Sequence, residues 1–340
     1  MRRLRLGLIG LGMASPPHAR SLIDLSDKVE VAGAYSPSVE RRRQFAAAFG
    51  LPVVDSADAI FDDRSVDAVI ILTPPNTHLE LVERAAASGK HILLEKPLEI
   101  SLERAGKLVD VAAEADVVLG VVLQHRFRAV SVALRDLVRD GRLGDLVGAS
   151  ARLSNWRPQS YYDQPGRGSR SRDGGGVLLT QGIHTLDLLI SLAGLPDEVA
   201  AYATTSPVHR METEDIAFAA VHFANGAIGG VSATTAAYPG YDDFIELIGA
   251  KGAARIEGGA LTINFYDGSQ KTLRDPSQGG GSGADPMAFS HERHRAVLED
   301  FLDAIRLGRE PLVSGREALK VHRLIAAILR SAQSGLRESV

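Results

Sequence analysis

The feature that most constrains this chain is a glycine-rich turn between an apolar strand and a helix near its start. Residues 4–9 form a short apolar run, and a G-x-G-x-x-S sequence follows at residues 10–15 before a helical pattern that continues to residue 25. Gly10 permits a tight turn, and Gly12 has no Cβ, so a pyrophosphate can approach the backbone closely. Free N–H groups and partial positive charge at the helix N-terminus favour phosphate binding. The stretch therefore predicts a dinucleotide site; the alternative is an ordinary surface turn.

The second strand, predicted at residues 29–35, bears on which nicotinamide cofactor is bound. In dinucleotide folds a carboxylate at the tip of this strand accepts the ribose 2′-hydroxyl of NAD, whereas a small residue with a nearby arginine admits the 2′-phosphate of NADP. This chain has Ser36 at the tip and Arg41 on the following helix. NADP is therefore slightly favoured over NAD, although such arginine runs also occur on exposed helix faces.

Strands and helices continue to alternate up to about residue 122. The apolar runs at residues 67–72, 91–94 and 117–122 are typical of strands buried on both faces of a parallel sheet. The pattern predicts an α/β fold with a doubly wound, Rossmann-type sheet of six parallel strands.

The loops after these strands carry candidate site residues, because ligands in open α/β sheets bind at the carboxyl ends of the strands. The loop TPPNTH begins at Thr73 and is a candidate for nicotinamide-ribose contact, although His78 within it is more typical of a structural histidine. Lys96 follows another buried strand, is fixed by Pro97, and is well placed to meet a substrate. The alternative for Lys96 is a surface lysine at a strand end.

After residue 123 the pattern changes to alternating strands with one face covered, at residues 147–156, 216–223, 228–235, 244–248 and 261–265. This predicts a dinucleotide-binding domain at residues 1–123, then an α+β domain at residues 124–340 with a large open, mixed or antiparallel sheet. The final helices of the second domain are free to pack back on the first. Residues 278–284 (QGGGSGA) read as a surface loop.

The second domain holds one segment rich in candidate side chains, residues 157–187. Its end, VLLTQGIHTLD, reads as a helix with His184 and Asp187 on one face, because i and i+3 residues are neighbours on a helix. Asp187 could orient or charge-stabilise His184. The alternative is a histidine that merely packs within a helix.

Composition excludes several classes of protein. The formal net charge of −4 gives no basic footprint for nucleic acid, and no apolar run approaches the roughly 20 residues of a membrane span. Cysteine is absent, which removes disulfides, a thiolate nucleophile and cysteine-based metal sites, and no metal is expected. Arg2, Arg3 and Arg5 mimic a secretory signal, but cleavage there would destroy the glycine-rich turn. A cytoplasmic location is expected.

Together the motifs GLIGLGMAS, TPPNTH, EKP, QHRF and GGGVLLTQGIHTLD resemble the Gfo/Idh/MocA oxidoreductases, the family of glucose–fructose oxidoreductase and inositol 2-dehydrogenase. The resemblance implies a Rossmann domain, a C-terminal domain with a mixed open sheet, and dimers or tetramers built through that sheet. It implies Lys96 as the active-site lysine, often followed by a cis proline. With the residues argued above, the expected cofactor contacts are Gly10, Gly12, Met13, Ala14, Ser36, Arg41, Thr73, Pro74, Asn76, His78, Glu95, Lys96 and Gln124.

One position departs from the family pattern. The family often has Asp or Asn four residues before the histidine, where this chain has Thr180, which cannot be a general base at neutral pH. Either His184 takes the proton with Lys96, or the substrate differs from the sugar type. Thr180 and Asp187 are expected to support the two catalytic residues.

The expected reaction is hydride transfer between a nicotinamide cofactor and a secondary alcohol of a sugar, cyclic polyol or related cyclic diol. His184 is the favoured base, and Lys96 either polarises the oxygen or, if it loses its proton, is the base itself. The candidate substrate contacts are Arg126, Trp156, Tyr161, Arg167, Thr180 and His184. The alternatives are a dehydrogenase of a carboxylated cis-dihydrodiol held by loop arginines, a cofactor-retaining lyase or hydrolase, and a non-catalytic cofactor-sensing protein.

Overall fold

The computed structural model describes residues 2–275 and 290–340, so the predicted loop at 278–284 lies outside the described residues. The chain divides into two compact units. Unit 1 comprises Met1–Gln124 and Ser290–Leu319, and unit 2 comprises His125–Phe289 and Lys320–Val340. The first break lies within one residue of the predicted boundary, and a late stretch of the chain returns to unit 1.

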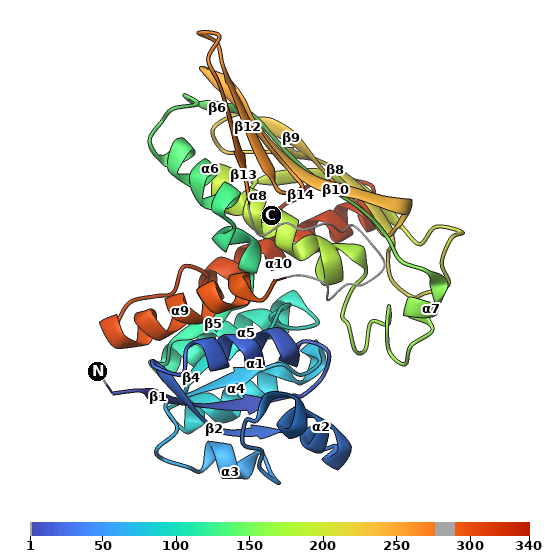
Figure 1. Ribbon diagram of the computed structural model, residues 1–340. Helices are drawn as coiled ribbons and strands as arrows, with labels where there is room; N and C mark the ends of the chain where they lie inside the picture. Colours follow the sequence, from blue (N-terminus) through green and yellow to red (C-terminus); the bar gives the residue numbers. More distant parts are fainter. Residues whose placement is uncertain (1, 276–289) are drawn as a thin grey trace. The chain divides into compact units, whose positions relative to one another are not determined.

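Unit 1 is built on a five-stranded parallel sheet in the order β2-β1-β3-β4-β5 (Figure 1). Its strands are β1 Leu4–Ile9, β2 Val29–Tyr35, β3 Ala68–Ile71, β4 His91–Leu94 and β5 Leu119–Val121. The expected number of six strands is wrong, because the described residues form a sheet of five, and the isolated bridge between Val53 and Ala34 adds no further strand. The chain order reverses between β1 and β3, which places a topological switch point there.

The helices of unit 1 follow its strands as predicted. They are α1 Ser15–Asp24, α2 Val39–Phe49, α3 Asp58–Phe61, α4 His78–Ala87 and α5 Leu102–Glu114, with the short 3₁₀ turn Pro75–Thr77. Helix α9 Glu292–Leu307 belongs to the late stretch of the chain, and a second 3₁₀ turn, Gln124–Phe127, begins at the last residue of the first segment of unit 1. The hydroxyls of Ser38 and Ser101 cap α2 and α5 by accepting backbone N–H groups. Strands β3 and β4 lie in the core, with Ile70 and Leu93 fully buried, as their continuous apolar runs predicted.

Unit 2 is built on a nine-stranded sheet in the order β13-β12-β11-β10-β6-β9-β8-β7-β14. Its strands are β6 Leu146–Trp156, β7 Glu198–Thr204, β8 Ile216–His222, β9 Ile228–Thr234, β10 Ala236–Gly249, β11 Gly252–Glu257, β12 Ala260–Phe265, β13 Gln270–Arg274 and β14 Glu338–Ser339. Only the β6–β9 pair is parallel, so the sheet is mixed. Four of these strands, β7, β11, β13 and β14, had no prediction from the sequence.

The helices of unit 2 are α6 Ala129–Arg139, α7 Gln159–Tyr162, α8 Ile183–Ala193 and α10 Gly315–Ser334, whose first residues belong to unit 1. Helices α6 and α8 lie together against one face of the sheet (Figure 1). Successive side chains of a strand point to opposite faces of the sheet, so the other face carries exposed side chains. Tyr202 and Phe218 are exposed there, whereas their chain neighbours Ala201 and Ala219 are buried. Across the described part of the chain, no helix has the length and apolarity needed to cross a bilayer.

Candidate active site

The residues expected to bind the cofactor lie along one edge of the unit 1 sheet. Each follows the carboxyl end of a different strand, and in spatial order across the sheet they are Ser36, Gly10, Thr73, Glu95 and Gln124. The carboxyl ends of parallel strands lie at the same edge of the sheet, so five segments spread over residues 10–124 form one continuous row. Gly10 and Thr73 flank the topological switch point, where open α/β sheets bind their ligands.

Two glycines in the first turn have different tasks. Gly10 has a φ of +103°, and a Cβ there would lie 2.8 Å from the carbonyl carbon of Leu72 at the end of the neighbouring strand. Among the residues that the structure describes, none apart from the two chain neighbours of Gly12 has an atom within 4 Å of the place that its Cβ would occupy. The fold therefore requires Gly10, whereas Gly12 leaves open space for a ligand.

The N-terminus of α1 differs from the expectation. The Ser15 N–H donates to the carbonyl oxygen of Gly12 at 3.1 Å, and Pro16 and Pro17 have no N–H at all. The helix start therefore supplies fewer free donors than the sequence pattern suggested. The N–H groups of the turn itself, around exposed Met13 and Ala14, are left to meet a phosphate.

At the tip of β2, a different arginine from the expected one contacts the strand. Arg42 donates from Nη1 to the carbonyl oxygen of Ser36 at 2.7 Å and from Nη2 to Asp55 at 3.2 Å. Arg41 is exposed, and its side chain has no hydrogen-bond or ion-pair partner among the residues that the structure describes. At the tip of β2, the Arg42 guanidinium is therefore held by contacts within the protein, whereas the Arg41 guanidinium is exposed and able to meet a ligand.

His78 cannot contact the cofactor as expected. Its side chain is fully buried, one ring nitrogen lies 2.9 Å from the Thr73 carbonyl oxygen, and the other lies 3.0 Å from that of Pro97. The ring therefore has no exposed atom to offer a ligand. It instead ties the loop after β3 to the loop after β4.

Glu95 and Lys96 follow β4. The Glu95 carboxylate lies 2.9 Å from Nε2 of His18 and accepts the backbone N–H of Lys96 at 3.1 Å. Burial alone would raise the pKa of Glu95, but the hydrogen bond with His18 and neighbouring positive charges lower that pKa below its ordinary value. The Lys96–Pro97 bond is cis, which confirms the expectation, and the Lys96 side chain is half-buried.

In unit 2, a π-helical turn at Leu178–Gly182 leads into α8, which carries His184 and Asp187. Buried Glu214 accepts the N–H groups of Gly176 and Leu178 at 3.1 and 3.2 Å and so satisfies the start of this helical segment. Burial raises the pKa of Glu214. The half-buried ring of His184 stacks on His125, with ring centroids 4.9 Å apart.

Arg126 and Asp187 pair with each other. Nε and Nη2 of Arg126 donate to the two carboxylate oxygens of Asp187 at 2.8 and 2.6 Å, and both side chains are more than nine-tenths buried. This bidentate pair gives Asp187 a partner other than the expected His184. It also corrects the assignment of Arg126 to the substrate, because the guanidinium is buried and its fork is engaged within the fold.

The remaining substrate candidates separate into two groups. The Thr180 hydroxyl lies 2.5 Å from Oε1 of Gln181, whose Nε2 donates to the Tyr161 hydroxyl at 3.4 Å. The Arg167 guanidinium lies over the Tyr161 ring, 5.1 Å from its centroid. Trp156 instead packs against Tyr238, with centroids 5.5 Å apart.

Sequence reasoning missed three residues at these sites: Arg42, His125 and Gln181. His125 was visible within the QHRF motif, and Gln181 lies next to Thr180. Nothing in three consecutive arginines distinguished Arg42 from Arg41, because only the path of the following loop brings Asp55 to one of them.

Comparison with known proteins gives matches over most of the chain. A family model described as "Oxidoreductase family, NAD-binding Rossmann fold" matches residues 4–123, and one described as "GFO/IDH/MocA C-terminal domain" matches residues 131–255. Inositol 2-dehydrogenase of Rhizobium meliloti is 30% identical over 96% of each chain. Myo-inositol 2-dehydrogenase of Thermotoga maritima is 28% identical over 92% of each chain.

Solved structures show the same architecture. A levoglucosan dehydrogenase in complex with NADH and levoglucosan superposes with a TM-score of 0.89 at 25% identity, covering 100% of both chains. The WlbA dehydrogenase of Bordetella pertussis, in complex with NADH and UDP-GlcNAcA, gives a TM-score of 0.85 at 28% identity, covering 100% of this chain and 99% of that one.

Proposed function

The chain belongs to the Gfo/Idh/MocA family and is a nicotinamide-dependent oxidoreductase of CH–OH groups, and we propose that its substrate is a sugar or cyclic polyol. A bound nicotinamide would supply the hydride chemistry, by taking hydride from the carbinol carbon of the substrate or giving it back. The row of Ser36, Gly10, Thr73, Glu95 and Gln124 along the carboxyl edge of the sheet supports the cofactor site, and the observation that carries the proposed substrate is the polar group of Tyr161, Thr180 and Gln181 in unit 2.

Lys96 and His184 are the proposed catalytic residues. Removal of hydride from an alcohol carbon requires that the hydroxyl proton go to a base and that charge developing on oxygen be stabilised. An imidazole accepts a proton near neutral pH, and an ammonium polarises an oxygen, so His184 as base and Lys96 as electrophile divide the two tasks. The stack of His125 on His184 helps to hold the imidazole in one orientation.

Hydroxyl-rich substrates suit the half-buried polar group in unit 2. Tyr161, Thr180 and Gln181 offer hydroxyl and amide groups in contact with one another. Arg167 is held over Tyr161, where it adds a donor for an anionic substituent. A carboxylated ring substrate, such as a cis-dihydrodiol acid, is therefore the second candidate; the inositol and levoglucosan dehydrogenases among the similar proteins favour the neutral polyol.

The test combines cofactor binding with turnover. Purified protein is stripped of nucleotide, titrated with NADH and NADPH by fluorescence, and then assayed for cofactor reduction with a panel of inositols, anhydrosugars and carboxylated diols. We expect saturable binding and net reduction with at least one neutral polyol. Binding of neither cofactor, or a tightly held cofactor left unchanged after product forms, would contradict the dehydrogenase and favour the sensing or cofactor-retaining alternatives.

The two glycines of the first turn provide a matched pair of variants. Gly12→Ala should weaken binding of both cofactors while lowering the free energy of unfolding by less than about 1 kcal/mol, because the new methyl group meets open space. Gly10→Ala should lower the free energy of unfolding by about 2 kcal/mol or more, because alanine disfavours a φ of +103° and its Cβ would clash with Leu72. Urea unfolding and NADH titration measure the two effects. Normal cofactor binding by Gly12→Ala would place the pyrophosphate elsewhere.

NADP is the proposed preferred cofactor, because Arg41 is available at a strand tip that lacks a carboxylate. Arg41→Ala should weaken NADPH binding by about 10-fold or more and NADH binding little, since the lost contact is to the 2′-phosphate. Arg43→Ala is the control, because Arg43 already pairs with Glu40 on the exposed helix face. Equal losses for the two cofactors would contradict the preference.

We also propose that the protein is a homodimer or homotetramer in the cytoplasm, assembled through the open face of the unit 2 sheet. Side chains of β7 and β8 lie exposed on that face, with Tyr202 at 85% and Phe218 at 58% of full exposure. Aromatic patches of this kind mark protein interfaces. Sedimentation equilibrium would give the subunit number.

A further inference from the structure

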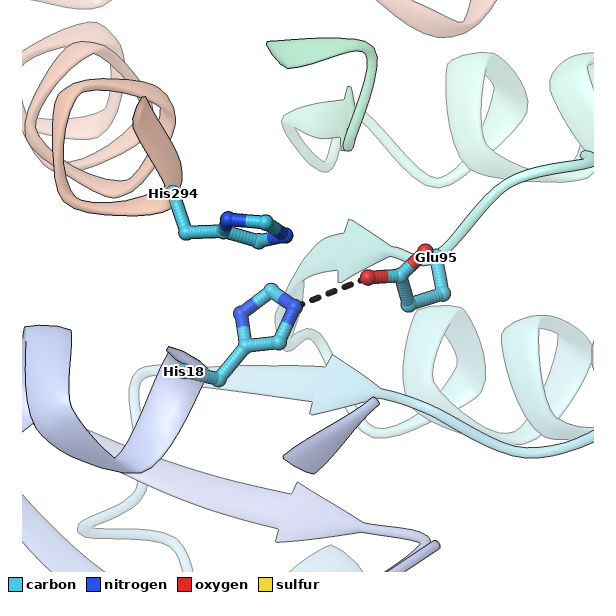
Figure 2. A group of neighbouring side chains, drawn as sticks. All are labelled: His18, Glu95 and His294. Atoms are coloured by element: carbon cyan, nitrogen blue, oxygen red, sulfur yellow. Dashed lines mark hydrogen bonds and ion pairs between the residues drawn. The ribbon is translucent and has the colours of Figure 1, made fainter. Parts of the chain in front are cut away.

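Three buried side chains from distant parts of unit 1 converge. His18 lies on α1, Glu95 follows β4, and His294 lies on α9. Figure 2 shows all three side chains pointing toward one another, with the His294 ring beside both His18 and the carboxylate. The two histidines are 1% and 4% exposed, and Glu95 is 8% exposed.

The atoms of this cluster match the chemistry of a transition-metal site. One imidazole nitrogen from each histidine and one carboxylate oxygen all lie within 4.8 Å of one another, and Nε2 of His18 lies 2.9 Å from the carboxylate. Around a tetrahedral zinc ion with bonds of about 2.0–2.2 Å, neighbouring ligand atoms lie about 3.3 Å apart. The 2.9 Å between His18 and Glu95 is slightly shorter than this spacing, and the 4.8 Å that bounds all three atoms is longer.

Two further features of the cluster bear on a metal site. Nδ1 of His18 is buried and has no hydrogen-bond partner within the described part of the chain, so the ring meets the carboxylate through Nε2, and Nε2 is the nitrogen placed to bind an ion. His18 and His294 lie on helices, which hold ligands more firmly than loops do, and Glu95 directly follows the buried strand β4. The two histidine rings are nearly perpendicular, 5.1 Å apart, and so do not close the space by stacking face to face.

We propose that His18, Glu95 and His294 bind one divalent transition-metal ion of the zinc type, with water as the fourth ligand. Two imidazoles and one carboxylate are a ligand set that zinc uses in proteins. The ion would tie α9 to α1 and to the end of β4, beside Lys96. The proposal shares Glu95 with the row of strand ends but does not depend on the proposed reaction, and its test does not use activity.

Chelator-stripped protein is titrated with Co²⁺, whose visible ligand-field absorption reports the coordination, and then with Zn²⁺ against a chromophoric chelator. We expect one equivalent of Co²⁺ with absorption typical of four-coordinate nitrogen and oxygen ligands, displaced by Zn²⁺. His294→Phe keeps a ring in the core and should lose about 100-fold or more in Zn²⁺ affinity, since second-shell changes alone cost about 10–100-fold. Glu95→Gln, which keeps the side-chain shape, should lose the same absorption.

His291→Gln is the matched control. His291 lies three residues before His294, at the start of the same helix, and pairs at the surface with Asp24 at 2.7 Å. This variant should bind Co²⁺ and Zn²⁺ like the unaltered protein. Absence of Co²⁺ absorption in the unaltered protein, or equal affinity in folded His294→Phe, would overturn the proposal and leave the cluster as a buried hydrogen-bond network.

Discussion

Lys96→Ala is expected to lower kcat by at least about 100-fold while leaving the Kd for the cofactor nearly unchanged. Lys96 follows β4 in the row of strand ends, and its backbone N–H is fixed by the Glu95 carboxylate at 3.1 Å. Its side chain is therefore directed by a rigid turn rather than by a mobile loop. In the transition state, negative charge develops on the substrate oxygen, and the Lys96 ammonium stabilises that charge. Because the ground state lacks this charge, loss of the ammonium lowers kcat much more than it changes the Kd for the cofactor.

The measurement is a steady-state comparison with the best polyol found for the unaltered enzyme. Lys107→Ala is the control, because Lys107 lies on the surface of the same unit and pairs with Glu83. Lys96→Arg keeps the positive charge and should recover part of the loss if the charge is what acts. Full turnover by Lys96→Ala would remove this residue from the mechanism.

The pH dependence separates the roles of Lys96 and His184. A base must be unprotonated, so activity in the direction of alcohol oxidation should fall as the pH drops through the pKa of that base. With His184 as the base, His184→Ala abolishes this acid limb along with most of the activity. An acid limb that persists in the residual rate of His184→Ala would make Lys96 the base instead.

Arg126→Met should lower the free energy of unfolding by about 3–5 kcal/mol, because it leaves the Asp187 carboxylate buried without its counter-charge. Both oxygens of that carboxylate currently accept from the Arg126 fork at 2.6 and 2.8 Å. Urea unfolding of the unaltered protein and the variant measures the difference.

The double variant Arg126→Met with Asp187→Leu should recover most of the lost stability, because replacement of both buried partners by apolar groups removes the unpaired charge. If the change in unfolding free energy of the double variant equals the sum of the changes in the two single variants, the pair does not stabilise the fold. A stable Arg126→Met protein with a greatly raised KM would instead return Arg126 to the substrate.

Local pattern predicted the first unit well because its elements are regular. The glycine turn and the buried strands each follow from a few neighbouring residues, and both appear in the structure. The missed strands β7 and β11 are rich in alanine and glycine, which carry little strand preference. They form because the neighbouring strands supply backbone hydrogen-bond partners: β7 pairs with β8, and β11 pairs with β10.

The partners of the site residues could not be predicted from the sequence, because tertiary structure decides which side chains meet. Residue type and nearness to a motif led to the assignment of Arg126 to the substrate and of Asp187 to His184. In the structure these two residues, 61 positions apart, pair with each other. His18 and His294 belong to no short metal-binding motif, since more than two hundred residues separate them. Only the packing of α9 against α1 brings their rings together.

The return of residues 290–319 to unit 1 has a consequence for biosynthesis. The backbone N–H of Val121 donates to the carbonyl oxygen of Val313 at 2.9 Å, and Phe301 is buried in the same unit, so residues 290–319 cover the outer edge of β5. While the protein is being translated, that edge stays uncovered until residues 290–319 have been synthesised, and uncovered strand edges are where chains aggregate. A fragment ending at residue 124 would keep that edge open permanently, so the nucleotide-binding half of this enzyme cannot mature before its partner domain has been synthesised.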